Sequence, residues 1–188
     1  MIADNKNLIR VLKSGGIAVI PTDTLYGISA LALSEKAIEK VYAVKKRASG
    51  KPMIVLISDI ADLEMFKIRI DKKTKEIFEK IWPGKVSVIL PCPDPEFRYL
   101  HRGTGFLAFR LPAKQDLRYL IETTGPLVST TVNPEGLLPA FTIPEARNYF
   151  GDLIDIYVNE GRIESQHSTL IKITDGEIEV LRQGEVKV

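Results

Sequence analysis

The apolar runs of this chain are short, and amphipathic stretches lie between them. The longest run, Met53 to Ile57, has the length of one buried strand, and Ile17 to Ile20 is similar. After Ser34, apolar residues recur every three or four positions, which is typical of a helix that begins behind a serine cap. This alternation of strand and helix predicts an α/β fold with the strands gathered into one sheet.

Further elements follow from the same periodicity. We predict helices around residues 8–12, over 71–82 and 113–122, and over 142–150 behind a Thr142/Glu145 capping box. We predict strands over 86–90, 106–110, 127–129, 154–158, 168–173 and 178–181, and a long loop over 91–105. The strand-rich C-terminal part argues against an all-parallel sheet. A length of 188 residues without repeats or linkers predicts a single domain over residues 1–188.

Charge and cysteine content exclude several classes of protein. With 26 basic and 24 acidic residues, the net charge of +2 is too small for a surface that coats nucleic acid. Cys92 is the only cysteine, so neither an internal disulfide nor a four-ligand zinc site with the two histidines is expected. No apolar run reaches membrane-spanning length, and charged residues stand near the N-terminus where a signal peptide is apolar. We expect a cytoplasmic protein that does not enter a membrane.

Two polar clusters follow predicted strands. Pro21 to Gly27 places two hydroxyls, a carboxylate and a phenol after one strand, and Ser129 to Gly136 places hydroxyls and an amide after another. Ligands of open α/β sheets bind beyond the carboxyl ends of strands, so the two clusters are predicted to face one crevice. Both segments also have the composition of ordinary turns, in which Thr, Asp and Asn bond their own backbone, and the sequence leaves that alternative open.

A basic segment, Lys45 to Lys51, surrounds a turn at Ser49 and Gly50. Its cations and the turn amides are suited to phosphate. Cations at the C-terminus of a helix also complement the helix dipole without any ligand, so this pattern alone does not decide between the two. The segment is not a Walker A loop, because no GxxxxGK[ST] occurs.

Other candidate sites are weaker. Gly103 to Ala108 matches a dinucleotide fingerprint literally, but a predicted strand follows where that site needs a helix, so we reject it. Arg110 ends the same strand, either as an anion clamp or as a solvated edge residue. His101 and His167 have no serine elbow or carboxylate at diagnostic spacing, so no Ser-His-Asp hydrolase and no protein nucleophile is predicted.

Taken together, these segments resemble the YrdC/TsaC family of L-threonylcarbamoyladenylate synthases over about residues 15–184. The motifs that carry the resemblance occur in the family's order: Pro21 to Gly27 (PTDTVYGL), Lys45 to Arg47 with Lys51-Pro52 (KxR, KP), Trp82 to Gly84 (WPG), Phe109 to Pro112 (VRxP), Ser129 to Gly136 (the SxN segment), Ser168-Thr169 (ST) and Leu181-Arg182 (LR). The chain departs from the pattern at four positions: Ala48, Thr131, Glu135 and Gln183. Thr131 replaces the serine of SxN and keeps a hydroxyl.

The resemblance implies a single YrdC-like α/β domain: a twisted, mixed parallel and antiparallel sheet with flanking helices and a concave, positively charged substrate cleft. It implies no C-terminal extension domain, because the chain stops soon after Arg182. It also implies that L-threonine, bicarbonate or CO2, and ATP give threonylcarbamoyl-AMP and pyrophosphate, the first step towards threonylcarbamoyladenosine in tRNA. The product would pass to a downstream threonylcarbamoyl-transfer complex, and tRNA would be involved only indirectly.

Carried over position by position, the family's functional residues give each motif a role. Lys45 and Arg47 would be catalytic. ATP would be bound by Arg47, Lys51, Thr131, Asn133 and Arg182, with Mg²⁺ carried by the nucleotide rather than by protein ligands. Threonine would be bound by Thr24, Tyr26, Arg110, Ser129 and Ser168. Because the threonine nitrogen attacks CO2 and the carbamate oxygen attacks the α-phosphorus, catalysis would need only positioning and charge stabilisation.

Two other functions stay open at this level. A YciO-like paralogue acting on a related adenylate shares the fold, and Thr131 in place of serine keeps that alternative in view. An RNA-binding module would use the same cations to neutralise a phosphate backbone without chemistry. The near-neutral net charge and the lack of aromatic residues within the basic segment argue against RNA binding.

Overall fold

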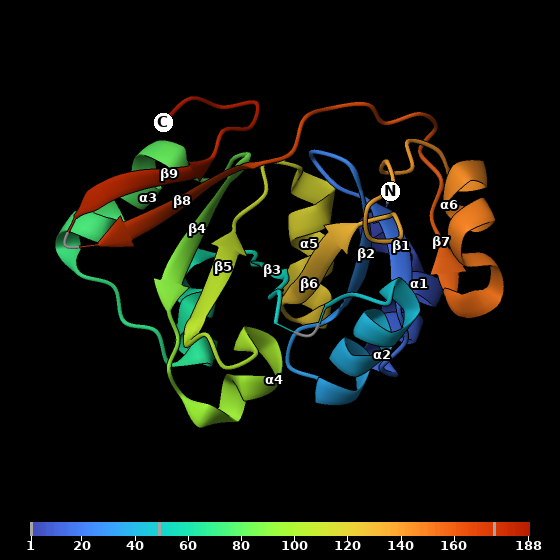
Figure 1. Cartoon of the computed structure of the whole chain (residues 1–188), viewed down its shortest axis with the longest axis horizontal. Helices are drawn as coiled ribbons and strands as arrows, with labels where there is room; N and C mark the ends of the chain where they lie inside the picture. The colour runs from blue at the N-terminus through green and yellow to red at the C-terminus, as the bar shows by residue number, and fades with distance from the viewer. Residues whose placement is uncertain (1, 49, 175) are drawn as a thin grey trace.

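The computed structural model describes residues 2–48, 50–174 and 176–188, and its strands form one nine-stranded sheet in the order β7-β1-β2-β6-β3-β5-β4-β8-β9 (Figure 1). The strands are β1 (Ala18–Pro21), β2 (Tyr26–Leu31), β3 (Ile54–Leu56), β4 (Val86–Pro91), β5 (Phe106–Arg110), β6 (Leu127–Thr131), β7 (Ile156–Tyr157), β8 (Thr169–Thr174) and β9 (Glu177–Arg182). Parallel pairing joins β1 to β7, β3 to β5 and β4 to β8, and the remaining neighbours are antiparallel. The predicted mixed sheet is confirmed.

The helices include two that begin at the predicted caps, Ser34 and Thr142. The full set is α1 (Lys6–Lys13), α2 (Glu35–Lys45), α3 (Lys72–Ile81), α4 (Arg98–His101), α5 (Gln115–Thr124) and α6 (Ile143–Phe150), with short 3-10 helices η1 (Ile2–Asp4), η2 (Ile60–Phe66), η3 (Pro95–Phe97) and η4 (Gly151–Leu153). The Ser34 hydroxyl accepts a hydrogen bond from the N–H of Ala37, at the start of α2. The predicted capping box of Thr142 and Glu145 is present at the start of α6.

Two regions differ from the sequence prediction. β2 was not predicted, because Gly27 and Ser29 interrupt its apolar pattern. The predicted long loop over 91–105 is wrong in part, since it contains η3 and α4. Asp94 caps η3 by accepting from the N–H of Glu96 at 2.9 Å, and Pro95 occupies the first turn, where a missing N–H does no harm.

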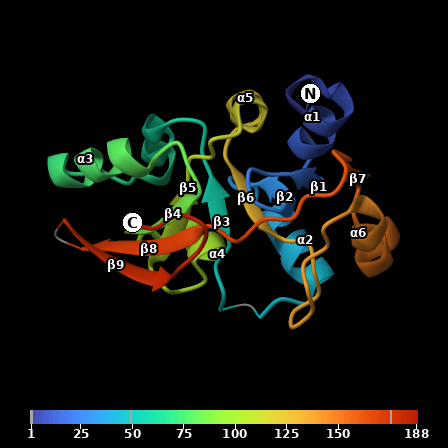
Figure 2. The same ribbon diagram turned by 90° about the horizontal axis from the view of Figure 1, so that it is seen from above.

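The helices cover both faces of the sheet but leave one region open. α1 and α5 pack on one face over an apolar cluster that includes Leu56, Leu120 and Leu127, and α2 and α6 lie on the opposite side (Figure 2). Strand register places Ser129, Ile54 and Ala108 in one row with Ile89 of β4 and Lys172 of β8. Partners in a sheet share a face, so this row continues the α1/α5 face towards β8. There it forms the floor of a cavity.

A long connection between β7 and β8 crosses over the top of the sheet. Residues 158–168 run from β7, at one edge, to β8, near the other (Figure 1). The Tyr26 hydroxyl donates to the carbonyl of Gly161 at 2.7 Å and accepts from the N–H of Glu160 at 2.9 Å. The connection is therefore fastened to the start of β2, and it delivers His167 and Ser168 to the cavity.

Candidate active site

A cavity of about 660 Å³ lies on the open part of the sheet face. Its floor is formed by β6, β3, β5, β4 and β8, and its walls by the turn before β2, the loop after α2 and the start of β8. Nine of the predicted site residues line it: Thr24, Tyr26, Arg47, Lys51, Arg110, Ser129, Thr131, Ser168 and Arg182. The prediction that the two polar clusters face one crevice is confirmed, because β2 and β6 are neighbours in the sheet.

The lining is rich in cations. Five of its members are basic, namely Arg47, Lys51, Arg110, Lys172 and Arg182, and within the described parts of the chain none of the lining residues is acidic. Two of these cations have carboxylate partners outside the lining, since Arg110 pairs with Asp23 and Lys51 with Glu135. A lining of this kind, with serine and threonine hydroxyls beside the cations, is suited to a ligand that carries phosphate or carboxylate groups.

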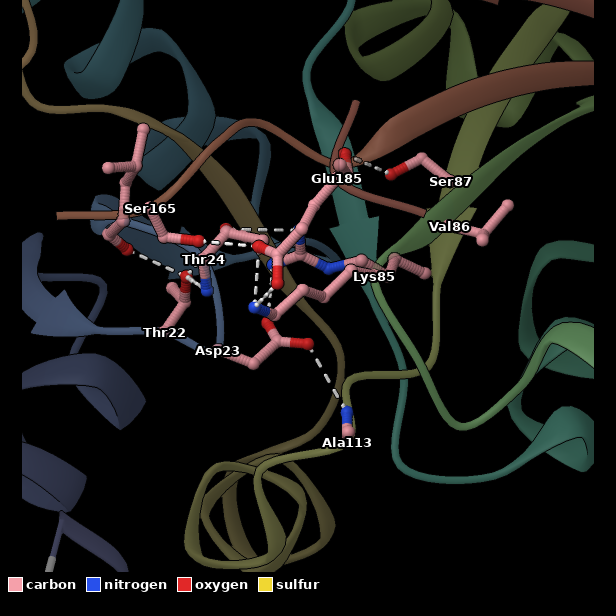
Figure 3. A network of polar contacts seen from close by, with 12 residues as sticks. Thr22, Asp23, Thr24, Lys85, Val86, Ser87, Ala113, Ser165 and Glu185 are labelled. Atoms are coloured by element: carbon pink, nitrogen blue, oxygen red, sulfur yellow. Dashed lines mark hydrogen bonds and ion pairs between the residues drawn. The ribbon is translucent and has the colours of Figure 1, made fainter. Parts of the chain in front are cut away.

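The turn between β1 and β2 forms its own hydrogen bonds and also lines the cavity. Thr22 donates its hydroxyl proton to the carbonyl of Leu25 at 2.7 Å and accepts from the N–H of Thr24 at 3.1 Å, as in an ordinary threonine turn (Figure 3). The hydroxyl of Thr24 lies 3.1 Å from that of Thr22, and both residues line the cavity. Turn formation therefore holds the hydroxyl of Thr24 at the wall of the site.

Arg110 is buried, so it is not a solvated edge residue. It is 3% exposed, its Nη2 lies 3.0 Å from Asp23 Oδ1, and its Nη1 donates to the hydroxyl of Thr24 at 3.3 Å. The other oxygen of Asp23 accepts from the N–H of Ala113 just before α5 (Figure 3). Burial lowers the pKa of Arg110, Asp23 opposes this, and Arg182 adds to it. Its Nε has no partner among the described residues.

Lys45 does not line the cavity, contrary to its predicted catalytic position. It is 4% exposed, and its ammonium group donates to the carbonyls of Thr131 and Asn133 and to the Asn133 side chain. Asn133 is also outside the lining: its Oδ1 accepts from the Thr131 hydroxyl at 2.6 Å, and its amide donates to Leu137 at 2.6 Å. Because these acceptors occupy the ammonium group, Lys45 holds the loop after β6 in place.

Replacing Lys45 with methionine is expected to change how stability depends on pH. Burial, and after it the charge of Arg47, lowers the pKa of Lys45 from 10.5 to about 8, while Glu135 opposes this. Between these two pH values the unfolded chain keeps a proton that the native protein has released, so the free energy of unfolding rises with pH, by at most about 3 kcal/mol. Below pH 8 both states hold the proton and the contribution is constant.

Urea unfolding of the wild type and of Lys45→Met at several pH values from 7 to 10 measures this contribution. The difference in unfolding free energy, wild type minus variant, should grow towards alkaline pH. A difference that stays constant over this range would show that Lys45 has an ordinary pKa in the native state.

The side chains of Arg47 and Lys51 stabilise the loop after α2 in which they lie. Arg47 donates from Nε to the carbonyl of Lys51 at 2.9 Å and from Nη2 to that of Pro52 at 3.0 Å. Glu135 pairs with the Lys51 ammonium group and accepts from the N–H of Ala48, so it ties this loop to the loop after β6. These contacts, the Lys51 bond first, lower the pKa of Glu135. The predicted phosphate-binding turn includes Ser49, which lies outside the described residues.

Ser168 and Arg182 meet at the other wall of the cavity. Arg182 Nη2 donates to the Ser168 carbonyl at 2.9 Å and approaches its hydroxyl at 3.4 Å. Burial lowers the pKa of Arg182 and, with the Arg182 charge, also that of His167. The floor opposite carries Ser129, and a Cβ built on neighbouring Gly27 would lie 2.3 Å from the Ser129 oxygen. Glycine at position 27 therefore leaves room for that hydroxyl.

Sequence reasoning missed several lining residues on the central and C-terminal strands, including Ile89, Phe106, Leu170 and Lys172. Lys172 lies 5.0 Å from the centre of the Phe106 ring, so a cation and an aromatic ring form this end of the cavity. The alternation of apolar and polar residues along a strand shows that the two faces of the strand differ. It does not show which strands are neighbours in the sheet, so it cannot identify which residues line a common cavity.

Gly103 and Gly105, which resemble a dinucleotide fingerprint, form a turn before a strand. The prediction that they are not a Rossmann site is therefore confirmed, because that site needs a helix at this point. β5 begins at Phe106, directly after Gly105, and the N–H groups of Gly103 and Gly105 donate to His101 Nδ1 at 3.1 and 3.2 Å. Both glycines have positive φ, which the turn needs. His101 therefore accepts hydrogen bonds that stabilise this loop.

In the described residues, no group of three or more His, Cys, Asp and Glu side chains is placed to hold a metal ion, and no helix is long and apolar enough to cross a membrane.

Comparisons with known proteins show what this chain is similar to. The family model for Sua5/YciO/YrdC, described as telomere recombination, matches residues 10–184. A threonylcarbamoyl-AMP synthase of Neisseria meningitidis is 34% identical over 170 residues, covering 88% of this chain and 87% of its own. A threonylcarbamoyl-AMP synthase of Bacillus subtilis is 34% identical over 128 residues, covering 67% of this chain and 37% of its own.

Among solved structures, Pyrococcus abyssi Sua5 complexed with L-threonine aligns with a TM-score of 0.87 at 25% identity, covering 97% of this chain and 54% of that one. The chain thus spans about half the length of that Sua5 protein. Escherichia coli YciO aligns with a TM-score of 0.84 at 21% identity, covering 99% of this chain and 90% of that one, which shows the shared fold. Since the family model spans nearly the whole sequence, the chain belongs to the Sua5/YciO/YrdC family.

Proposed function

We propose that this protein is a threonylcarbamoyl-AMP synthase that acts as one domain and as a nucleotidyltransferase. Its substrates are L-threonine, bicarbonate or CO2, and ATP as its Mg²⁺ complex, and its products are threonylcarbamoyl-AMP and pyrophosphate. The observation that carries the proposal is the convergence of nine predicted substrate-binding residues on one cavity from widely separated parts of the sequence. The synthase names of its relatives support it.

The reaction needs no protein nucleophile. The threonine nitrogen attacks the carbon of CO2 and loses a proton to solvent, which gives a carbamate. A carbamate oxygen then attacks the α-phosphorus of ATP, and the bond from that phosphorus to the oxygen leading to the β-phosphate breaks. Negative charge develops on the leaving pyrophosphate, so fixed cations accelerate this step.

The described side chains divide into two groups that fit these needs. Arg47, Lys51 and Arg182 are cations at the walls of the cavity and are assigned to the phosphates. Thr24, Arg110 and Ser129 are assigned to threonine, with Arg110 as the partner of its carboxylate. Tyr26 lines the same region, but its hydroxyl is occupied by the 158–168 connection, so we assign it to positioning. Lys45, Thr131 and Asn133 support the loop that carries part of the wall.

The experiment that tests this function is to incubate the purified protein with ATP, Mg²⁺, bicarbonate and L-threonine and to detect products by mass spectrometry. Threonylcarbamoyl-AMP and pyrophosphate should form only when both threonine and bicarbonate are present. No product from a folded protein that binds ATP would contradict the proposal and favour a YciO-like activity on another adenylate. Tight, salt-sensitive binding of duplex RNA that ATP does not displace would favour the RNA-binding alternative.

The product chemistry also suggests the next step. Threonylcarbamoyl-AMP is a mixed anhydride that hydrolyses readily, so an acceptor must take it soon after release. We propose that a threonylcarbamoyl-transfer complex in the cytoplasm receives it for tRNA modification, and that tRNA does not enter this cavity.

Replacing Arg47 with alanine is expected to lower kcat/KM for ATP by roughly 100-fold, because a cation facing the developing charge is lost. The same change removes the two hydrogen bonds to the carbonyls of Lys51 and Pro52. Since Arg47 is half-buried, we expect a loss of only about 1 kcal/mol in unfolding free energy. Steady-state release of pyrophosphate and urea unfolding measure the two effects.

Arg98→Ala is the matched control, because Arg98 is an exposed arginine of α4 that does not line the cavity. It should leave both quantities close to those of the wild type. Turnover of Arg47→Ala that equals the wild type would remove Arg47 from the proposed machinery.

A further inference from the structure

Ser87 is a buried hydroxyl that the proposed function does not use. It lies on β4, has no exposed surface, and is paired in register with Leu170, a lining residue of β8. The Ser87 side chain therefore lies on the cavity side of the sheet, but other residues cover it and it does not line the cavity. Its oxygen lies 2.9 Å from the Ser168 oxygen, a contact drawn as a dashed line at the Ser87 side chain in Figure 3.

The hydrogen bond between the two serines admits two arrangements. Within the described part of the chain, Ser168 is the only side-chain or backbone partner of the Ser87 hydroxyl. If Ser168 donated to Ser87, the proton of a fully buried Ser87 would have no acceptor, which is unfavourable. If Ser87 donates to Ser168, both hydroxyls are satisfied, and the Ser168 proton is free to point elsewhere.

Arg182 favours the same arrangement. Its Nη2 approaches the Ser168 oxygen at 3.4 Å and donates to the Ser168 carbonyl at 2.9 Å. With one donor from Ser87 and one from Arg182, both lone pairs of the Ser168 hydroxyl are occupied. The group that remains for a ligand is the proton, so Ser168 can offer a hydrogen bond to the cavity but cannot accept one.

We infer that Ser87 is a positioning residue that holds the Ser168 hydroxyl as a hydrogen-bond donor towards the carboxylate of L-threonine. This inference rests on the proposed function, which assigns threonine to this cavity. The arrangement gives specificity, because a hydrogen-bond donor in the same cavity as Arg110 favours an anionic oxygen and disfavours an ammonium group. Ser87 acts only through Ser168, since it does not line the cavity itself.

Calorimetric titration of L-threonine into the Ser87→Ala variant tests the inference without any turnover. We expect the dissociation constant for threonine to rise roughly tenfold, as for one misdirected hydrogen bond to a charged group, while that for ATP changes less than twofold. In a Ser168→Ala background, Ser87→Ala should cause no further loss of threonine affinity, because the two residues act as one unit. A loss that persists in that background, or a larger effect on ATP than on threonine, would overturn the inference.

Ser29→Ala is a matched control. Ser29 is another serine without exposed surface, on β2, and its hydroxyl has no hydrogen-bond partner among the described residues. Ser29 does not line the cavity, so the Ser29→Ala variant should bind threonine as tightly as the wild type does. Equal threonine affinity of the wild type and Ser87→Ala would disprove the role of Ser87. A wild type that binds no threonine at all would instead contradict the proposed function.

Discussion

Replacing Arg110 with methionine should destabilise the protein by about 3 to 5 kcal/mol, because it leaves a buried carboxylate without its cation. The side chains of Arg110 and Asp23 are 4% and 5% exposed, and their closest atoms are 3.0 Å apart. Among the described residues, Asp23 keeps only the N–H of Ala113 as a donor at its other oxygen. The variant should also bind L-threonine too weakly to measure, since the proposed carboxylate partner is gone. Urea unfolding and calorimetry give the two quantities.

A second substitution separates the charge effect from the loss of packing. Asp23→Asn in the Arg110→Met background removes the unpaired charge, so the double variant should regain part of the unfolding free energy while threonine binding stays absent. A single variant within about 1 kcal/mol of the wild type would show that solvent reaches Asp23, and that the pair behaves as a surface ion pair.

Replacing Gly184 with alanine should detach the C-terminal tail from the start of β8. A Cβ at this position would lie 2.2 Å from the His167 carbonyl oxygen and 2.5 Å from the Thr169 nitrogen, which are backbone atoms that cannot rotate away. The N–H of Gly184 also donates to the Thr169 hydroxyl at 3.0 Å, and that of Glu185 to the His167 carbonyl. We expect a loss of about 1 to 3 kcal/mol in unfolding free energy, as for overpacking in a core.

The same substitution should weaken binding, because the displaced segment carries part of the cavity wall. His167, Ser168 and Arg182 all line the cavity and lie within a few residues of the clash. Gly50→Ala is the control for stability, since a Cβ there meets nothing within 4 Å. A Gly184→Ala variant as stable as Gly50→Ala would show that the tail is not packed against β8 as described.

Local signals predicted much of the secondary structure. Ser34 and the Thr142/Glu145 box define helix starts through side chains that bond N–H groups three residues away, so the sequence alone contains the whole interaction. Strand positions followed from apolar runs for the same reason. β2 was missed because Gly27 and Ser29 interrupt its apolar pattern, and glycine at position 27 leaves the space that the Ser129 hydroxyl needs.

The fold class, the family resemblance and the segments that carry the polar chemistry can all be predicted from the sequence, because they depend on residue types and short spacings. Which of those residues share a cavity depends on how the strands and helices pack in three dimensions. Strand order brings β2 beside β6 and β4 beside β8, although these segments are far apart in the chain. The β4–β8 pairing placed Ser87 behind Ser168, and the tertiary packing buried Arg110 against Asp23 and turned Lys45 away from the cavity. Each of these contacts joins residues more than eighty positions apart, a distance over which periodicity and capping carry no information.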